Sequence, residues 1–214
     1  VTCWGSDSNG QLGNGAPSAD VVAPPAPVTL PSPGTAVSVS AGYSHACALL
    51  TDGKVTCWGA YSNGQLGNGA ASADVITPPS PITLPSPGTA IAISAGDFHT
   101  CAVLAGGDVT CWGSGLFGAL GNGSSGIVDV PPAPVSLPGG AAAVGVSAGD
   151  FVSCALLAAG DISCWGNGGH HMLGTGSLVN AMTPSPVVTL PGGREASAVA
   201  VGSHSVCAAV GAGI

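Results

Sequence analysis

The chain has 214 residues, a formal net charge of −8, and positive side-chain charge at Lys54 and Arg194 alone. Charged residues make up 6% of it, against roughly 25% in ordinary globular domains. So few cations argue against a nucleic-acid groove and against electrostatic binding to anionic lipid. The sequence has no apolar run of about 20 residues, so we expect no membrane insertion by a helix.

The first complete set of elements in chain order predicts β-strands joined by turns. Residues 37–50 mix alternation with small residues, as expected of a half-buried strand and its neighbour, and residues 51–53 (TDG) form a turn. The strand returns at 54–59 (KVTCWG). A double Asn-Gly loop at 62–69 then holds one apolar residue, and the proline-rich segment 76–89 predicts an outer edge strand or surface strap.

These elements recur, so the sequence is a tandem repeat. The Cys-Trp-Gly triplets begin 54, 54 and 53 residues apart, and the other four cysteines are 54, 53 and 53 residues apart. Short strands at this spacing, with one Gly/aromatic motif per unit, are typical of a propeller or solenoid. We predict one all-β repeat domain over 1–214, with four blade-like units of antiparallel strands: 37–90, 91–143, 144–194, and a split unit of 1–36 plus 195–214.

The cysteines are predicted to form one bridge within each unit. Placing Cys47 opposite Cys57 sets Leu49 opposite Val55, and directly opposed cysteines in antiparallel strands suit a disulfide. The spacing lacks the short knuckles of a zinc site. Because such bridges persist in oxidising surroundings, an extracellular or cell-surface location is expected. The predicted pairs are Cys47–Cys57, Cys101–Cys111, Cys154–Cys164, and Cys207 with Cys3.

Two apolar positions in each unit are predicted to pack between repeats. The tryptophan next to each Cys-Trp-Gly cysteine leaves the opposite face of the strand, and the leucine of each Asn-Gly loop can point inward. These residues are Trp4, Trp58, Trp112 and Trp165, and Leu12, Leu66, Leu120 and Leu173.

The segment SAGYSHACALLTDGKVTCWGAYSNGQLGNG, from residue 40, resembles the repeat of the regulator of chromosome condensation family, in its bacterial form with paired cysteines. The resemblance covers essentially the whole chain. It implies a β-propeller with blades of four antiparallel strands, usually seven, whose loops bind partners. The loops at 114–123 and 167–176 depart from the pattern, and the scarcity of basic residues speaks against chromatin docking.

Catalytic and metal sites are not predicted. His45, His99 and His204 recur at related positions, where a structural hydrogen bond is favoured over catalysis. As neighbouring strand residues, His170 and His171 would point to opposite faces and chelate poorly. Isolated acids fit turn capping better than calcium binding: Asp20, Asp74, Asp129, Asp97 and Asp150. We expect no enzyme activity and no cofactor. Asn122 begins an N-glycosylation acceptor sequence.

The two ends of the chain read as halves of one hairpin. CAAVGAGI, residues 207–214, followed by VTCWG, residues 1–5, restores the same thirteen-residue unit that begins at Cys47. No secretory signal is visible and Val1 is not a translation start, so a signal is expected to have been removed or to lie upstream. Either a four-bladed ring closes within the chain, or the repeats continue into a longer propeller or array.

The predicted function follows from that split hairpin. The first expectation is a non-catalytic extracellular structural protein, the repeat unit of a fibre or long array, whose partners are copies of itself joined head to tail. The alternative is a secreted propeller that binds an extracellular protein or glycan through the loops at 114–123 and 167–176. The distance from Ile214 to Val1 would distinguish a ring from an array.

Overall fold

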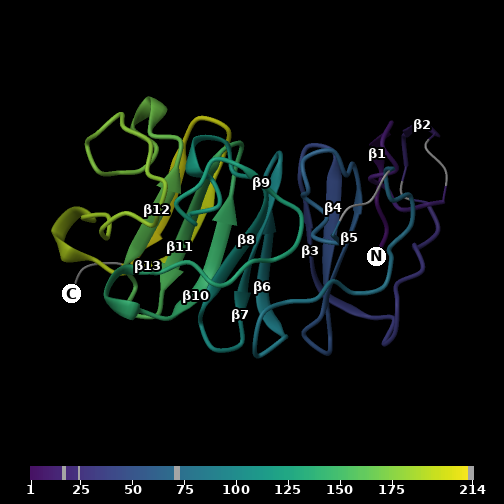
Figure 1. The fold of residues 1–214 in the computed structure, drawn as a ribbon, viewed down its shortest axis with the longest axis horizontal. Coiled ribbons are helices and arrows are strands. Elements are labelled where there is room, and N and C mark those ends of the chain that lie inside the picture. Colours follow the sequence, from purple (N-terminus) through teal and green to yellow (C-terminus); the bar gives the residue numbers. More distant parts are fainter. Residues whose placement is uncertain (16–17, 24, 70–72, 212–214) are drawn as a thin grey trace.

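The computed structural model describes residues 1–15, 18–23, 25–69 and 73–211. Small antiparallel sheets stand side by side along the long axis, with the N-terminal end of the chain at one extremity and the C-terminal end at the other (Figure 1). The described secondary structure consists of strands and single 3-10 turns, which confirms the all-β prediction. Among the described residues no helix is long and apolar enough to cross a membrane.

Three central sheets form complete blades. The middle one has four strands, and the two beside it have three strands and an isolated bridge in the fourth position, at Val75 or Ala181. Their strands are β3 (Ala36–Ala41), β4 (His45–Leu50) and β5 (Val55–Gly59); β6 (Ala90–Ala95), β7 (His99–Leu104), β8 (Val109–Ser114) and β9 (Ile127–Val128); and β10 (Ala143–Ala148), β11 (Val152–Leu157) and β12 (Ile162–Gly166).

The hairpin register within each blade is the one that the cysteine spacing predicts. Cys47 lies opposite Cys57, and Leu49 opposite Val55. Disulfides join Cys47 to Cys57, Cys101 to Cys111 and Cys154 to Cys164. The proline-rich connectors occupy the position of the fourth strand in each blade. A proline there has no N–H group to donate to the hydrogen bonds of the sheet.

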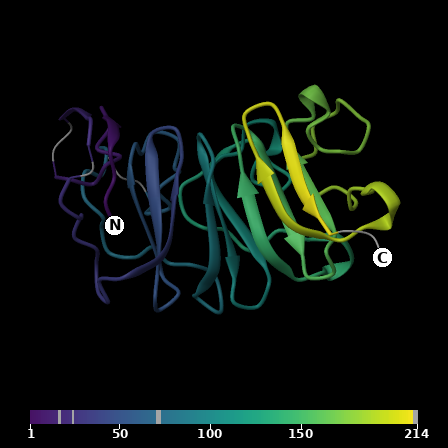
Figure 2. The same ribbon diagram turned by 180° about the vertical axis from the view of Figure 1, so that it is seen from behind.

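The two ends of the molecule are half-blades. At the N-terminal end, β1 (Gly5–Asp7) pairs with β2 (Ser18–Val21). At the C-terminal end, β13 (Ala196–Val201) pairs with β14 (Val206–Val210). These hairpins lie at opposite extremities (Figure 2), and Cys3 and Cys207 are both free thiols. The described residues therefore form an open arc and not a four-bladed ring closed by Cys207 and Cys3. Ile214 lies outside the described residues.

The core is divided into layers between neighbouring blades. The cysteine-bearing face of each of the first two complete blades packs on the tryptophan-bearing face of the next one. In one layer, Cys47, Leu49 and Cys57 pack with Leu104 and Trp112. The following layer repeats this arrangement one blade further along, whereas in the last layer Cys154 and Cys164 pack with Ala196 of the C-terminal half-blade and no tryptophan takes part. Each blade is therefore stabilised on both faces by its neighbours.

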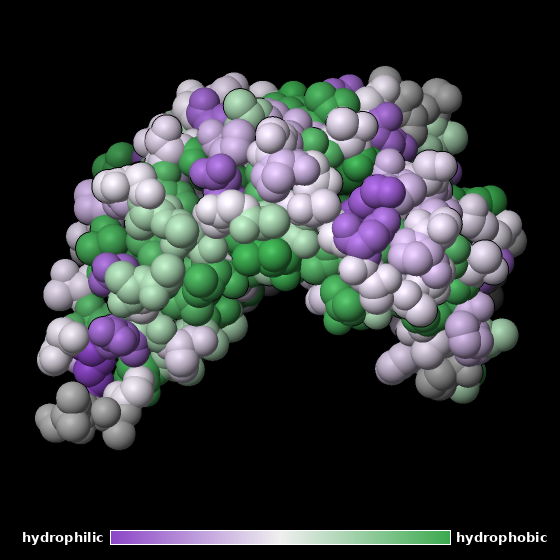
Figure 3. Space-filling view, turned by 90° about the horizontal axis from the view of Figure 1, so that it is seen from below, coloured by the Kyte–Doolittle hydropathy of each residue, from purple (hydrophilic) through white to green (hydrophobic). Residues whose placement is uncertain are grey.

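The first strands of the blades converge while the outer strands fan apart. β3 contacts β6, β6 contacts β10, and β10 contacts β13. Residues of these strands remain exposed, including Val39, Ile91 and Val144. In the space-filling view the molecule is an arch with apolar residues along its hollow side (Figure 3). Four 3-10 turns complete the fold: η1 (Leu116–Gly118), η2 (Pro138–Gly140), η3 (Gly169–His171) and η4 (Pro191–Gly193).

Candidate functional site

Three of the four tryptophans hold neighbouring blades together. The indole Nε1 of Trp112 donates a hydrogen bond of 3.0 Å to the carbonyl of Gln65 in the preceding blade. Trp58 and Trp165 donate in the same way to Gln11 and Ala119. All three rings are fully buried, and Leu12, Leu66, Leu120 and Leu173 are buried as well. In this structure these residues are structural, and a ligand platform is not formed at them.

Trp4 differs from the other three, because its side chain is 58% exposed. The prediction of inter-repeat packing does not hold for Trp4 within this arc. Its face of the half-blade would pack on a preceding blade, and the arc ends there.

His45 and His99 belong to the same network of inter-blade bonds. His45 Nε2 lies 2.8 Å from the Thr100 hydroxyl, which donates to the Gln65 carbonyl. His99 Nε2 pairs equivalently with Ser153. Burial lowers the pKa of His45 to about 3 and that of His99 to about 4, so both rings are neutral. These two histidines have the structural role that the repeat positions predict.

The remaining histidines lie elsewhere. His170 and His171 occupy the turn η3 with positive φ of 56° and 58°, and not a strand. The expectation that they point to opposite faces of a strand is therefore wrong, because the loop is a turn here. The His170 ring instead meets the His204 ring edge to face, with centroids 5.1 Å apart. Within the described ranges, no three His, Cys, Asp or Glu side chains form a group that could hold a metal ion.

The side chains of the acidic residues accept hydrogen bonds from several parts of the chain. Asp74 accepts hydrogen bonds from Asn9 Nδ2 and from the Tyr61 amide, which are 65 and 13 residues away in the chain, so Asp74 links separate segments and does not cap its own turn. Asp7, which the sequence reasoning did not select, is fully buried and accepts from the Leu12 amide. Asn122 is exposed, and its Oδ1 accepts from the Ser124 amide.

Aromatic side chains from consecutive blades form a ridge along one rim of the arch. Tyr43 lies 6.0 Å from Phe98, and Phe98 stacks at 5.4 Å on Phe151. Phe117, from the turn after β8, meets Phe151 edge to face at 5.3 Å. Tyr43 is 71% exposed, and Phe117 is 37% exposed. We call Tyr43, Phe98, Phe117 and Phe151 the aromatic ridge.

Two carboxylates accompany the aromatic ridge, from the residues just before Phe98 and Phe151. Partial burial raises the pKa of Asp97. Burial also raises the pKa of Asp150, with a further increase from the negative charge of Asp97 and an opposing effect of His204. Both carboxylates lack the hydrogen bonds expected of turn caps within the described part of the chain. The two carboxylates are near enough for the charge of Asp97 to act on Asp150, and each directly precedes a half-buried ring of the ridge in the sequence.

Glycines bring the loops of the ridge together. A Cβ on Gly42 would clash with the Gly96 carbonyl, and a Cβ on Gly96 would clash with the Gly149 carbonyl. Because each loop rests directly on the next one, rings from different blades come within stacking distance. Phe117 has positive φ of 58°, a conformation that is costly for a bulky residue and that is concentrated at functional sites.

Comparisons with known proteins identify the family of the repeat and structures with a similar fold. The sequence profile described as "Regulator of chromosome condensation (RCC1) repeat" matches residues 1–49, 52–103, 106–156 and 159–209. A second profile with the same description matches 36–65 and 90–119. The chain is 31% identical over 189 residues to the ultraviolet-B receptor UVR8 of Arabidopsis thaliana, covering 87% of this chain and 40% of the receptor.

Other relatives also exceed this chain in length. The mouse E3 ubiquitin-protein ligase HERC2 is 32% identical over 209 residues, which are 97% of this chain and 4% of HERC2. The structure of human WBSCR16 matches 99% of this chain with a TM-score of 0.87 and 22% identity. Yeast RCC1 (Prp20), solved bound to Kap60, matches 100% with a TM-score of 0.81 and 22% identity. This chain covers 53% and 50% of those two structures, so it has the curvature of about half of each.

Proposed function

The chain belongs to the regulator of chromosome condensation repeat family, and on that premise we propose that it is a non-catalytic binding module. Its partner is a protein segment that carries cationic side chains, and it docks on the aromatic ridge. The module acts outside the cell or at its surface. The observation that carries this proposal is the ridge itself, in which the exposed rings of Tyr43 and Phe117 adjoin two half-buried rings that the carboxylates of Asp97 and Asp150 directly precede in the sequence.

The chemistry of the ridge favours a cationic partner. Aromatic faces attract lysine and arginine side chains, and carboxylates beside them add charge-assisted hydrogen bonds. The chain has a net charge of −8 and two cations, of which Lys54 pairs with Asp52 at 3.2 Å. A positively charged segment is therefore attracted by the whole molecule before it reaches the ridge.

Two further observations support a protein-binding module. Yeast Prp20, whose fold this chain shares, was solved in complex with the protein Kap60. In addition, the arc has the curvature of half a propeller, which is the expected shape for a ring segment and differs from a straight fibre. The location outside the cytoplasm rests on the three disulfides, which persist in oxidising surroundings.

The test is selection of a random peptide library on the oxidised protein, followed by binding measurements with the selected peptides. We expect enrichment of arginine and lysine, and loss of affinity in Phe117→Asn and Phe98→Ser. These substitutions preserve the fold because Asn63 and Ser44 occupy the same two positions in another repeat. Asp97→Asn should weaken binding, and its matched control Asp161→Asn, in an exposed hairpin turn, should not.

Some outcomes of these measurements would contradict the proposal. Enrichment of acidic peptides, or equal affinity in all four variants, rules out the ridge as the docking surface. Binding to an array of neutral glycans that depends on Phe117, with no peptide selected, replaces the protein partner with a carbohydrate.

A further inference from the structure

Six of the seven asparagines in the chain are followed directly by glycine. In such a pair the glycine nitrogen can attack the side-chain Cγ of the asparagine, because glycine has no Cβ to obstruct the approach. The attack closes a succinimide ring and expels ammonia, so these pairs are the points at which the chain is most open to deamidation. They are Asn9-Gly10, Asn14-Gly15, Asn63-Gly64, Asn68-Gly69, Asn122-Gly123 and Asn167-Gly168.

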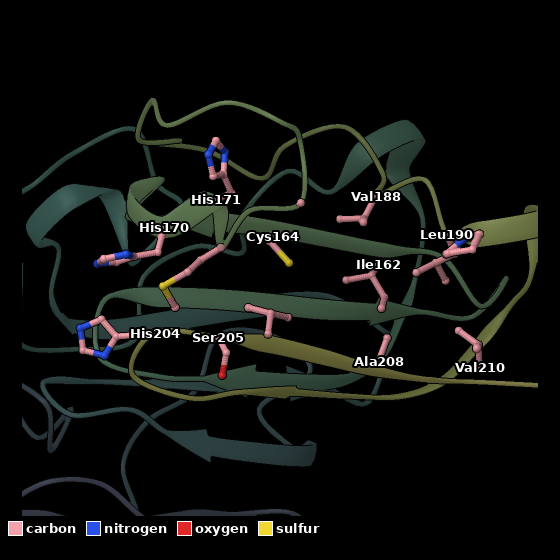
Figure 4. A pocket seen from close by; sticks show the side chains of 14 residues that line it. Ile162, Cys164, His170, His171, Val188, Leu190, His204, Ser205, Ala208 and Val210 are labelled. Atoms are coloured by element: carbon pink, nitrogen blue, oxygen red, sulfur yellow. The ribbon is translucent and has the colours of Figure 1, made fainter.

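The amide of each of these glycines is hydrogen-bonded in the structure, and three of the bonds stay within one unit. Gly10 and Gly64 each donate to the carbonyl three positions earlier. Gly168 donates to the side-chain carbonyl of Asn180 in its own blade. The loop of Gly168 continues into η3, where His170 borders the cavity beside β12 (Figure 4). An amide nitrogen that is held on an acceptor in this way is a poor nucleophile.

The other three glycine amides donate across the border between two blades. The Gly69 N–H donates to the Asp129 carbonyl of the next blade at 2.9 Å, and the Gly123 N–H donates to the Met182 carbonyl at 2.8 Å. Gly15 makes the equivalent bond at 3.0 Å. These amides keep their acceptors only while the two blades remain in contact.

The border beside Gly123 is tightly packed. A Cβ on Gly118 would lie 2.7 Å from the Met182 Cα of the next blade. At the same border, Trp165 Nε1 and the Ser153 hydroxyl both donate to the Ala119 carbonyl. Closed blades therefore hold the Gly123 amide in place, and succinimide closure requires that the border opens first.

We propose that Asn68 and Asn122 are modification sites that deamidate when the blades beside them separate. In the closed arc the neighbouring connector occupies the glycine amide. Separation of the blades frees this amide, and the acidic product persists after the blades close again. Each site therefore keeps a covalent record of the opening of one border. This inference is independent of the aromatic ridge.

At Asn122 the reacting groups lie in one turn. The side chain is exposed, and its Oδ1 accepts a 3.0 Å hydrogen bond from the Ser124 amide, which folds the carboxamide back over the backbone. The Gly123 nitrogen bonds to Cγ, the Cγ–Nδ2 bond breaks, and the amide proton leaves with the nitrogen as ammonia. One water then opens the imide at either C–N bond and leaves aspartate or isoaspartate. Water is the only co-reactant, and nothing is oxidised or reduced.

The first measurement compares deamidation in the folded protein and in urea at mildly alkaline pH, by peptide mapping with mass spectrometry. Asn68 and Asn122 should react at least about ten-fold more slowly in the folded protein, because only the small fraction with an open border is reactive. Equal rates in the folded protein and in urea overturn the proposal.

The second measurement opens one border at a time in the folded protein. Trp165→Phe removes an indole donor at the border of Gly123, and Trp112→Phe removes the equivalent donor at the border of Gly69. Trp165→Phe should accelerate deamidation of Asn122 roughly three- to ten-fold, as expected for loss of one buried hydrogen bond, and leave Asn68 unchanged. Trp112→Phe should accelerate Asn68 and leave Asn122 unchanged.

A milder pair of variants makes the same comparison if the tryptophan variants lose their fold. Ser153→Ala and Thr100→Val each remove a hydroxyl donor at these two borders. Asn167 is the internal control, because the bond of its glycine lies within one blade, and it should keep the wild-type rate in every variant. Acceleration of both border sites by one variant, of neither site, or of Asn167 as well overturns the proposal.

Discussion

The indole Nε1 of Trp112 donates a 3.0 Å hydrogen bond to the carbonyl of Gln65, 47 residues earlier in the chain. The Thr100 hydroxyl donates to the same carbonyl at 2.9 Å, and His45 of the preceding blade contacts that hydroxyl. One backbone carbonyl thereby connects three side chains from two blades. Because the group is buried, loss of the Thr100 hydroxyl would leave His45 Nε2 without its partner, which is costly.

The first prediction concerns the glycine beneath the Trp112 indole. Gly67→Ala should lower the free energy of unfolding by roughly 2 to 4 kcal/mol, because positive φ and a clash with Trp112 act together. The control is Gly123→Ala, which has similar φ of 81° and no neighbour within 4 Å, and should cost about 1 to 2 kcal/mol. Urea unfolding measures both, and equal losses would show that the indole can move aside.

The second prediction is a loss of stability in mild acid that originates at the buried histidines. The folded state holds the pKa of His99 at about 4, whereas the unfolded chain has the ordinary value near 6.5. Between these values the unfolded state binds a proton that the folded state does not. Stability is therefore present above about pH 6.5 and decreases as the pH falls, by on the order of 1 kcal/mol per pH unit.

The measurement is urea unfolding at several pH values for wild type and His99→Val, since Val152 occupies this position in the next repeat. The variant should have a shallower dependence of stability on pH between about 4 and 6.5. His171→Gln, which removes an exposed histidine, should keep the wild-type dependence. Parallel curves for wild type and His99→Val would contradict a buried neutral imidazole at this position.

The third prediction separates the bridged cysteines from the free ones. The Cys101→Ala/Cys111→Ala variant opens a loop of about 11 residues and should lose about 2 to 3 kcal/mol of stability from chain entropy, with a further loss from the buried space. Cys3→Ala/Cys207→Ala should change little in dilute monomeric protein, because both thiols are free. Thermal unfolding compares them, and similar losses in the two variants would refute the distinction.

The fourth prediction is that the Asp97 carboxylate, which we propose binds the partner at the aromatic ridge, lowers the stability of the fold. Burial raises the pKa of Asp97, so the fold disfavours the charged form, and the resulting loss of stability develops as the pH rises above the ordinary value near 3.8. Asp97→Asn should therefore raise the Tm at neutral pH by on the order of 1 to 2 °C, with no gain at pH 3. A lower Tm in this variant at pH 7 would indicate a structural role for the carboxylate.

The strands, their register and the bridges could be predicted from the sequence, because a cysteine spacing within one hairpin fixes which residues stand opposite one another. Burial of Trp58, Trp112 and Trp165 followed from the same periodicity. Trp4 obeys the same periodicity, yet it is exposed, because burial depends on a neighbouring blade as well as on the residue itself.

The aromatic ridge could not be predicted in this way. Phe98 and Phe151 occupy one repeat position, Tyr43 another and Phe117 a third, so no single period connects them. Their contact depends on the rotation between blades and on the close approach of Gly42, Gly96 and Gly149. The signal that was present is the aromatic substitution at Phe117, where the equivalent residues of the first two units are Asn9 and Asn63.

Every cystine in the described chain lies within a blade, whereas the contacts between blades are hydrogen bonds and apolar surfaces. A mechanical load applied along the chain would therefore separate the blades one after another without breaking a covalent bond. In each released blade the residues between the two bridged cysteines could not lengthen, whereas the residues outside the bridge could. The bridges therefore reduce the length to which each blade can extend, and the resistance of the arc to pulling resides in the borders between the blades.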